Sequence, residues 1–138
     1  MSMMAAARRN GHRLQRMKTL ARDGVRKALA TSADEMVGMM KRLAPVDSGT
    51  LRDSIGWTWG DAPEGSFAIA SATSGEFTIT IYAGSKEAWY AFLVEYGTVK
   101  TPAQPFFLAS YRANRKRASR RVARAVGKAA REAVRGPA

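Results

Sequence analysis

The feature that most constrains the fold of this chain is a change of hydrophobic period at Pro45. Over residues 14–43, apolar side chains recur every three or four positions, which predicts one long amphipathic helix. Because proline disfavours the helical conformation in the residue before it, this helix should end near Ala44. Gly24 weakens the helix and Ser32 is a polar position in its apolar stripe, so the sequence allows a break near one of them.

Three segments after Pro45 alternate apolar and polar residues, as strands do. They cover residues 55–59, 66–72 and 76–83, and the turn sequences DAPEG and TSG separate them. Short turns predict an antiparallel meander, and its aromatic face needs the first helix as a cover. Residues 105–134 predict a second long helix. The expected fold class is therefore α+β: an antiparallel sheet of three or more strands packed against a long N-terminal helix, with a long basic C-terminal helix.

The corner sequence APVDSGTLRDSI, residues 44–55, contains a serine on a tight turn, but it lacks the Gly-x-Ser-x-Gly pattern that exposes a nucleophile. A structural interpretation fits better. Asp47 or Ser48 would cap a short helical turn, while Leu51 and Ile55 would point inward. A second short helix is one interpretation of SKEAWYAFLVEYGT, with Gly97 as its C-terminal cap.

The other residues that could carry chemistry do not form a site. His12 is the single histidine and the chain has no cysteine, so a metal centre built on imidazole and thiolate is not expected. Asp34 and Glu35 are adjacent on a helix and should point apart. The sequence therefore predicts no enzyme, no catalytic residues, no cofactor and no metal. It also has neither an apolar run long enough to span a membrane nor a secretory signal pattern.

Charge is distributed very unevenly along the chain, whose formal net charge is +12. Residues 1–27 carry +7 and residues 112–138 carry +9, whereas residues 28–111 carry −4. Basic ends of this kind favour a polyanion or an acidic protein surface as partner. We expect a single domain over residues 1–138, made of a flexible basic N-terminus (1–13), a core (14–112) and a basic helical extension (113–138).

The predicted C-terminal helix has two contrasting sides when residues are placed about 100° apart. One side carries small apolar residues: Ala118, Val122, Ala125, Val126, Ala129 and Ala133. The opposite side carries cations that could contact DNA or an acidic partner: Arg117, Arg121, Arg124, Lys128, Arg131 and Arg135. A solvated basic face is the alternative interpretation, and the sequence leaves both open.

Two segments together go beyond generic patterns: the corner APVDSGTLRDSI and YAFLVEYGTVKTPAQPFF, residues 90–107. Over about residues 14–112 the chain resembles the tail-completion, or head–tail joining, proteins of long-tailed phages and phage-like gene transfer agents. The sequence departs from the family pattern at Phe107-Leu108-Ala109, where Leu-Arg-Pro often follows, and this leaves the position within the neck open. The motif residues that carry the resemblance are Pro45, Asp47, Gly49, Leu51, Ile55, Glu95, Gly97, Thr98, Pro105 and Phe106.

The resemblance implies a structural virion protein with an α+β fold and no cofactor. It implies a homo-oligomeric ring, typically a hexamer, at the end of the tail that meets the head, assembled in the host cytoplasm. The implied partners are other copies of the chain, the neighbouring head-completion or neck protein, the major tail protein, and non-specific DNA in the ring lumen, with no membrane.

Two further points stay open on sequence alone. Glu95 lies between apolar residues and needs a partner, which could be backbone N–H groups of the Thr98–Thr101 loop or a group across a subunit boundary. The alternative function is a basic nucleic-acid-binding accessory protein, which would need only the two basic ends.

Overall fold

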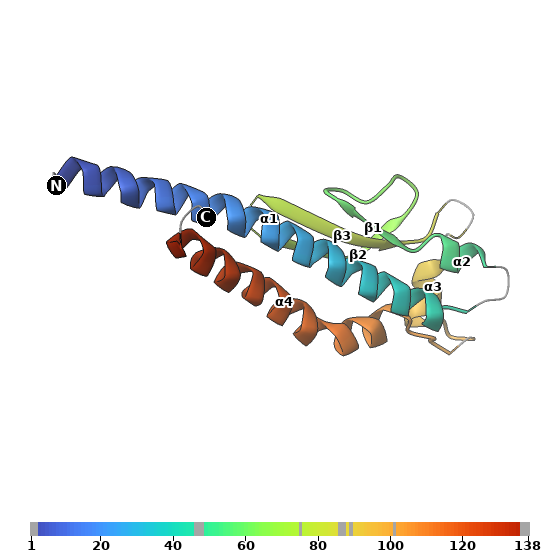
Figure 1. Cartoon of the computed structure of the whole chain (residues 1–138). Coiled ribbons are helices and arrows are strands. Elements are labelled where there is room, and N and C mark those ends of the chain that lie inside the picture. Colours follow the sequence, from blue (N-terminus) through green and yellow to red (C-terminus); the bar gives the residue numbers. More distant parts are fainter. Residues whose placement is uncertain are drawn as a thin grey trace.

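The computed structural model describes residues 3–45, 49–74, 76–85, 88, 90–100 and 102–135. Two long helices lie side by side and cover one face of a small sheet (Figure 1). The confirmed fold class is α+β, with a long N-terminal helix, a three-stranded antiparallel sheet and a long C-terminal helix. The elements in chain order are α1 (Met3–Leu43), α2 (Thr50–Asp53), β1 (Gly56–Trp59), β2 (Phe67–Ser74), β3 (Phe77–Ala83), α3 (Ala91–Tyr96) and α4 (Phe107–Arg135).

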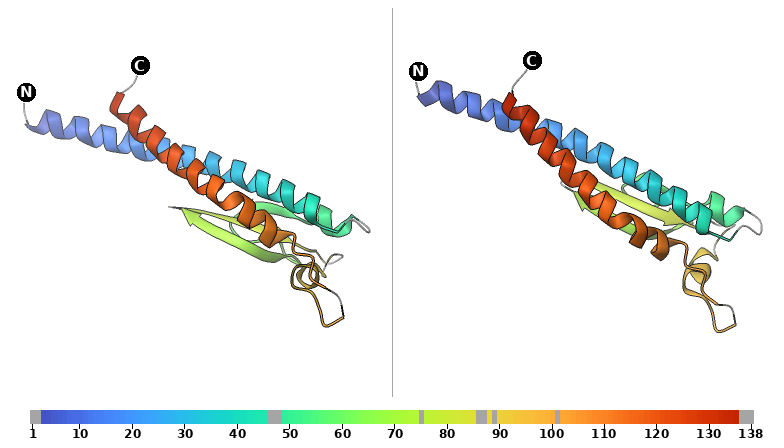
Figure 2. Two further views of the ribbon diagram at one scale, coloured as in Figure 1. Left: turned by 90° about the horizontal axis from the view of Figure 1, so that it is seen from below. Right: turned by 60° about the horizontal axis from the view of Figure 1, so that its bottom comes forward.

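Helix α1 is longer than the sequence pattern predicted and is continuous, so the break that the sequence allowed near Gly24 or Ser32 does not occur. Packing against α4 explains the continuity. A Cβ at Gly24 would lie 3.3 Å from the Cβ of Ala125, so this glycine marks a close approach of the two helices. The Ser32 hydroxyl is buried and accepts a 2.9 Å hydrogen bond from Arg121 of α4. The N-terminal part of α1 extends past both α4 and the sheet (Figures 1 and 2).

The strands lie where the alternation predicted them, but their order is β1-β3-β2, which corrects the expected meander. Both outer strands pair with β3 in antiparallel register: Trp57 lies opposite Ile81, and Ala70 lies opposite the same residue on the other edge. Ile79, Thr80 and Ile81 of β3 are all buried, so the most buried strand takes the central position and satisfies its backbone on both sides. The β1–β2 connection therefore leads to the far edge of β3 rather than forming a hairpin.

The aromatic face of the sheet is covered by α1, as the sequence predicted. Trp57 donates a 2.7 Å hydrogen bond from its indole Nε1 to Asp34. The guanidinium of Arg26 lies 5.2 Å from the centre of the Trp59 ring, a cation–π contact. Asp34 thus points to the sheet, whereas its neighbour Glu35 pairs with α4, so the two carboxylates diverge as expected.

The described residues of the corner after α1 form a tight turn and contribute to the core. Gly49 has φ 77°, a left-handed conformation that suits glycine, and the amide of Asp53 returns to the Gly49 carbonyl at 2.9 Å. Leu51 and Ile55 point inward and are only 2% and 3% exposed. Asp47 and Ser48, the expected caps, lie outside the described residues. The corner therefore delivers two core side chains while turning the chain from helix to sheet.

Candidate functional site: the second motif and the two flanks of α4

The second motif centres on a buried carboxylate. Glu95 of α3 is 3% exposed, and both of its oxygens bind the N-terminus of α4. Oε2 accepts from the amides of Phe106 at 3.0 Å and Phe107 at 2.9 Å, and Oε1 accepts from the amide of Leu108 at 3.0 Å. A helix N-terminus leaves such amides without intrahelical partners, and its dipole favours an anion there. Glu95 therefore caps α4.

This geometry places Glu95 differently from the sequence expectation. The carboxylate does cap backbone N–H groups, but they belong to the start of α4 rather than to the Thr98–Thr101 loop. Gly97 ends α3 at φ 76° and donates its amide to the Leu93 carbonyl at 2.7 Å, which confirms the predicted helix cap. A role of Glu95 across a subunit boundary stays a prediction.

The structure brings the two motif segments together in one core. Leu51 and Ile55 from the corner belong to the same hydrophobic cluster as Phe106, which is fully buried. Pro45 is partly buried, whereas Thr98 and Pro105 are exposed.

Sequence reasoning missed Ser54, whose hydroxyl donates to the Leu51 carbonyl at 2.6 Å and accepts the Gly84 amide at 2.9 Å. The contact with Gly84 could not be predicted, because the two residues are far apart in the sequence.

An ion pair joins the two long helices. Arg121 of α4 donates to both carboxylate oxygens of Glu35, at 2.8 and 3.1 Å, and also to Ser32. Arg117 lies 3.6 Å from the same carboxylate and is 60% exposed. The hydrogen bond from Arg121 lowers the pKa of Glu35, partial burial opposes this effect, and the charges of Arg121 and Arg117 add to the lowering.

This pair engages Arg121, one of the predicted contact residues, within the subunit. Arg121 was expected on the outer basic face, but its side chain is only 21% exposed and already engaged within the subunit. Its long stem starts near the boundary between the apolar and basic sides, which lets the guanidinium reach α1. We therefore remove Arg121 from the residues offered to an external partner.

The Glu35–Arg121 pair predicts a pH-dependent contribution to stability. Because the pKa of Glu35 is lowered on folding, its stabilising effect is complete above the unfolded pKa and is lost as pH falls through the folded value. Urea denaturation should therefore show that Glu35→Gln is less stable than the wild type at neutral pH, with a difference that shrinks below about pH 4. Glu64→Gln, at an exposed turn position, is the control and should change stability by less than about 0.5 kcal/mol at neutral pH. A Glu35→Gln difference that stays constant in acid would contradict the assignment.

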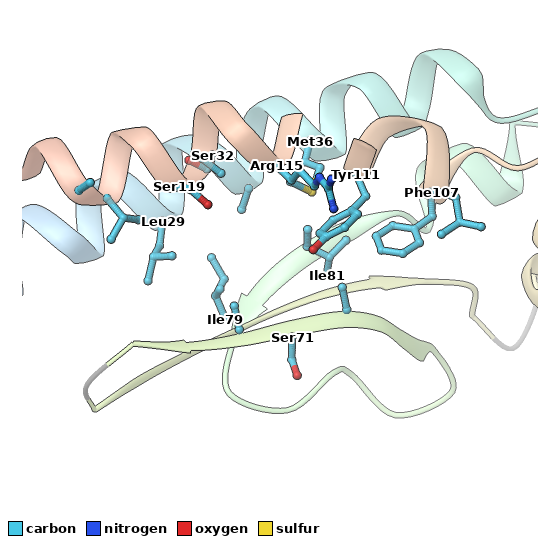
Figure 3. Close-up of a pocket in the computed structure, with 17 residues that line it drawn as sticks. Leu29, Ser32, Met36, Ser71, Ile79, Ile81, Phe107, Tyr111, Arg115 and Ser119 are labelled. Carbon is cyan, nitrogen blue, oxygen red and sulfur yellow. The ribbon is translucent and has the colours of Figure 1, made fainter. Parts of the chain in front are cut away.

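One flank of α4 forms an apolar groove with the sheet. The groove has a volume of about 690 Å³ and is bounded by α1, α4 and strands β2 and β3. Figure 3 shows Ile81 below the ring of Tyr111, whereas Ile79 lies nearer to Leu29. Small residues form its rim, among them Ala72 on the edge strand β2 and Ser119 and Ala123 on α4. An open apolar surface beside an edge strand is typical of a protein interface.

The other flank of α4 is basic. It forms a crevice of about 370 Å³ with α1, and the cations that line it come from both helices: Lys27 from α1, and Arg124 and Lys128 beside the paired Arg121 from α4. Arg131 and Arg135 continue along exposed positions of α4. Ala129 and Ala133, predicted in the apolar stripe, are buried, whereas Val126 is 47% exposed.

Within the described part of the chain, no group of three or more potential carboxylate, imidazole or thiolate ligands could hold a metal ion. None of the helices formed by the described residues is sufficiently long and apolar to cross a bilayer. The recognisable features are therefore surfaces: the apolar groove and the basic crevice.

Comparison with known families gives a match over most of the chain. A family model described as "Bacteriophage HK97-gp10, putative tail-component" matches residues 11–97. The matched segment runs from α1 through the corner and the sheet to the end of α3, so it includes the first motif and Glu95-Tyr96-Gly97 of the second. Neither the curated proteins nor the solved structures gave a match.

Proposed function

Because the chain belongs to the HK97-gp10-like family of phage tail components, we propose that it is a structural subunit of a ring that completes the tail and joins it to the head. As a phage tail component it is associated with the virion. In this proposal the chain assembles in the host cytoplasm as a homo-hexameric ring. The ring contacts a neck or head-completion protein on one side and the major tail protein on the other. The role is structural and needs neither catalysis nor a cofactor.

One observation carries the ring proposal: the same chain has an open apolar groove and a projecting helical arm that exposes apolar side chains among its arginines. The groove lies between α4 and the sheet, beside edge strand β2. The arm is the start of α1, where Met3, Met4 and Leu14 are 90%, 68% and 56% exposed. The groove and the exposed apolar side chains of the arm are two different surfaces of one chain, and this favours a head-to-tail contact between copies. Such a contact closes into a ring when the rotation allows. We therefore assign a second copy of this chain to the groove.

The charge distribution supports DNA in the lumen of this ring. Six copies would carry about +72, and like charges at this density oppose assembly unless a polyanion or acidic neighbours neutralise them. The basic flank of α4 and the groove lie on different sides of that helix. One flank can thus face a neighbouring subunit while the other faces DNA.

The test is to locate the chain in particles and to count it there. A tagged chain should be labelled at the end of the tail that meets the head in electron micrographs. Chemical cross-linking of the same particles should give a ladder that ends at six copies, about 90 kDa from the 15.0 kDa chain. Label along the whole tail or at its distal tip would overturn the proposal. The alternative, a nucleic-acid-binding accessory protein, predicts label on DNA and none on particles.

A further inference from the structure

We infer that the basic crevice between α1 and α4 is a binding site for the phosphate backbone of DNA. This inference deepens the proposed function, because it assigns the DNA contact to named residues on two helices. The crevice is lined by Lys27 and Thr31 on one side and by Arg124 and Lys128 on the other. One acidic residue, Glu132, is also among the lining residues, and its Oε1 lies 3.8 Å from the Nζ of Lys128.

The walls of the crevice are held at a fixed separation. Gly24 and Ala125 lie in its lining, and the two helices approach so closely there that a Cβ on Gly24 would be 3.3 Å from the Cβ of Ala125. Arg121 fastens α4 to Glu35 of α1 near one end of the crevice. The cations are therefore presented by a rigid pair of helices, so less conformational entropy is lost when they contact an anion.

The cations form a row whose length suits a nucleic acid. From Arg117 to Arg135 the basic flank of α4 extends about 27 Å at 1.5 Å per residue. At about 3.4 Å per phosphate along one strand, that length matches roughly eight phosphates. At 100° per residue, Arg9, Arg13 and Arg16 lie on the same side of α1 as Lys27 and extend the basic surface along the projecting arm.

This continuity favours DNA over an acidic protein surface. A protein partner would offer carboxylates at scattered positions, whereas a phosphate backbone offers a continuous row of charges to cations that recur every three or four residues along α4. The residues described in the structure form no sequence-reading module beside this row, so the contact is with phosphates and is independent of sequence. Such binding must weaken steeply as salt rises, because each contact releases counterions.

The experiment compares two triple variants of the full chain. Lys27→Gln, Arg124→Gln and Lys128→Gln together remove three cations of the crevice and leave Arg121 in place. The control removes three exposed cations that do not line the crevice: Arg42→Gln, Lys100→Gln and Arg112→Gln. Both variants lose the same net charge. Affinity for a short duplex of mixed sequence is measured by fluorescence anisotropy over a series of NaCl concentrations.

We expect the crevice variant to bind the duplex more weakly, with a slope of log K against log salt that is smaller by about 2 to 3, or about 0.9 per lost phosphate contact. The control should retain nearly the wild-type slope, and circular dichroism should show both variants folded. Equal weakening in both variants would overturn the site, because it would show a general charge effect. Binding to polyglutamate with none to the duplex would overturn it in favour of an acidic protein partner. Ring formation, measured by cross-linking, reports on the proposed function separately.

Discussion

Replacing Glu95 by Ala should lower the free energy of unfolding by about 3–5 kcal/mol, because three amides lose a charged acceptor at once. The amides of Phe106 and Phe107 belong to buried residues, so water cannot readily replace the carboxylate. The empty space left beneath α4 adds to the loss. Urea denaturation followed by circular dichroism measures the change as a shift of the midpoint.

Glu95→Gln separates the charge from the shape. The amide oxygen can still accept from Phe106 and Phe107, but its NH₂ group would then face the Leu108 amide, which is also a donor. We expect Glu95→Gln to lower the free energy of unfolding, but by less than Glu95→Ala does. Glu64→Ala, at an exposed turn position, serves as the matched carboxylate control and should change stability by less than about 0.5 kcal/mol. A Glu95→Ala protein as stable as this control would refute the capping role.

The position of Glu95 has a consequence for assembly. The carboxylate sits where α3 meets the start of α4, and α4 forms one wall of the apolar groove. Loss of the cap would therefore loosen the helix that presents both the groove and the basic crevice. If the ring proposal holds, Glu95→Gln should reduce assembly more than its modest loss of stability alone would.

Much of the fold follows from local patterns in the sequence. The change of period at Pro45 predicted the end of α1, and the alternating segments predicted the strands to within a few residues. Adjacent positions on one helix predicted that Asp34 and Glu35 point apart. These features depend on backbone geometry and hydrophobic period, which are properties of a short window of sequence.

Features that depend on pairing between distant segments could not be predicted in the same way. Alternation shows that β1 is a strand, but it does not encode that β1 pairs with β3 rather than with β2. The helical projection placed Arg121 with the other cations, because it takes no account of a carboxylate on another helix. The groove could not be predicted from any single segment of the sequence, because α1, α4 and two strands each supply part of its lining.

The groove gives the largest expected effect on assembly. Ser119→Glu with Ala123→Glu would place two carboxylates on its rim, at positions of α4 that are exposed in the subunit. Burying an unpaired charge in a subunit contact costs about 3–5 kcal/mol, so ring formation should weaken by about a hundredfold or more. The yield of particles with joined heads and tails should fall accordingly. Denaturation of the isolated subunit should be nearly unchanged, since neither position is in the core.

The matched control is Ala109→Glu with Ala113→Glu, because these residues are also exposed on α4, have the same spacing, and do not line the groove. Both double variants add the same charge to the same helix, so a general electrostatic effect on assembly would appear in both. Only occupation of the groove by a second copy predicts that the control assembles while the rim variant does not. Normal cross-linking ladders from the rim variant would show that the groove is not the contact between subunits. Failure of both variants would assign the defect to charge rather than to the groove.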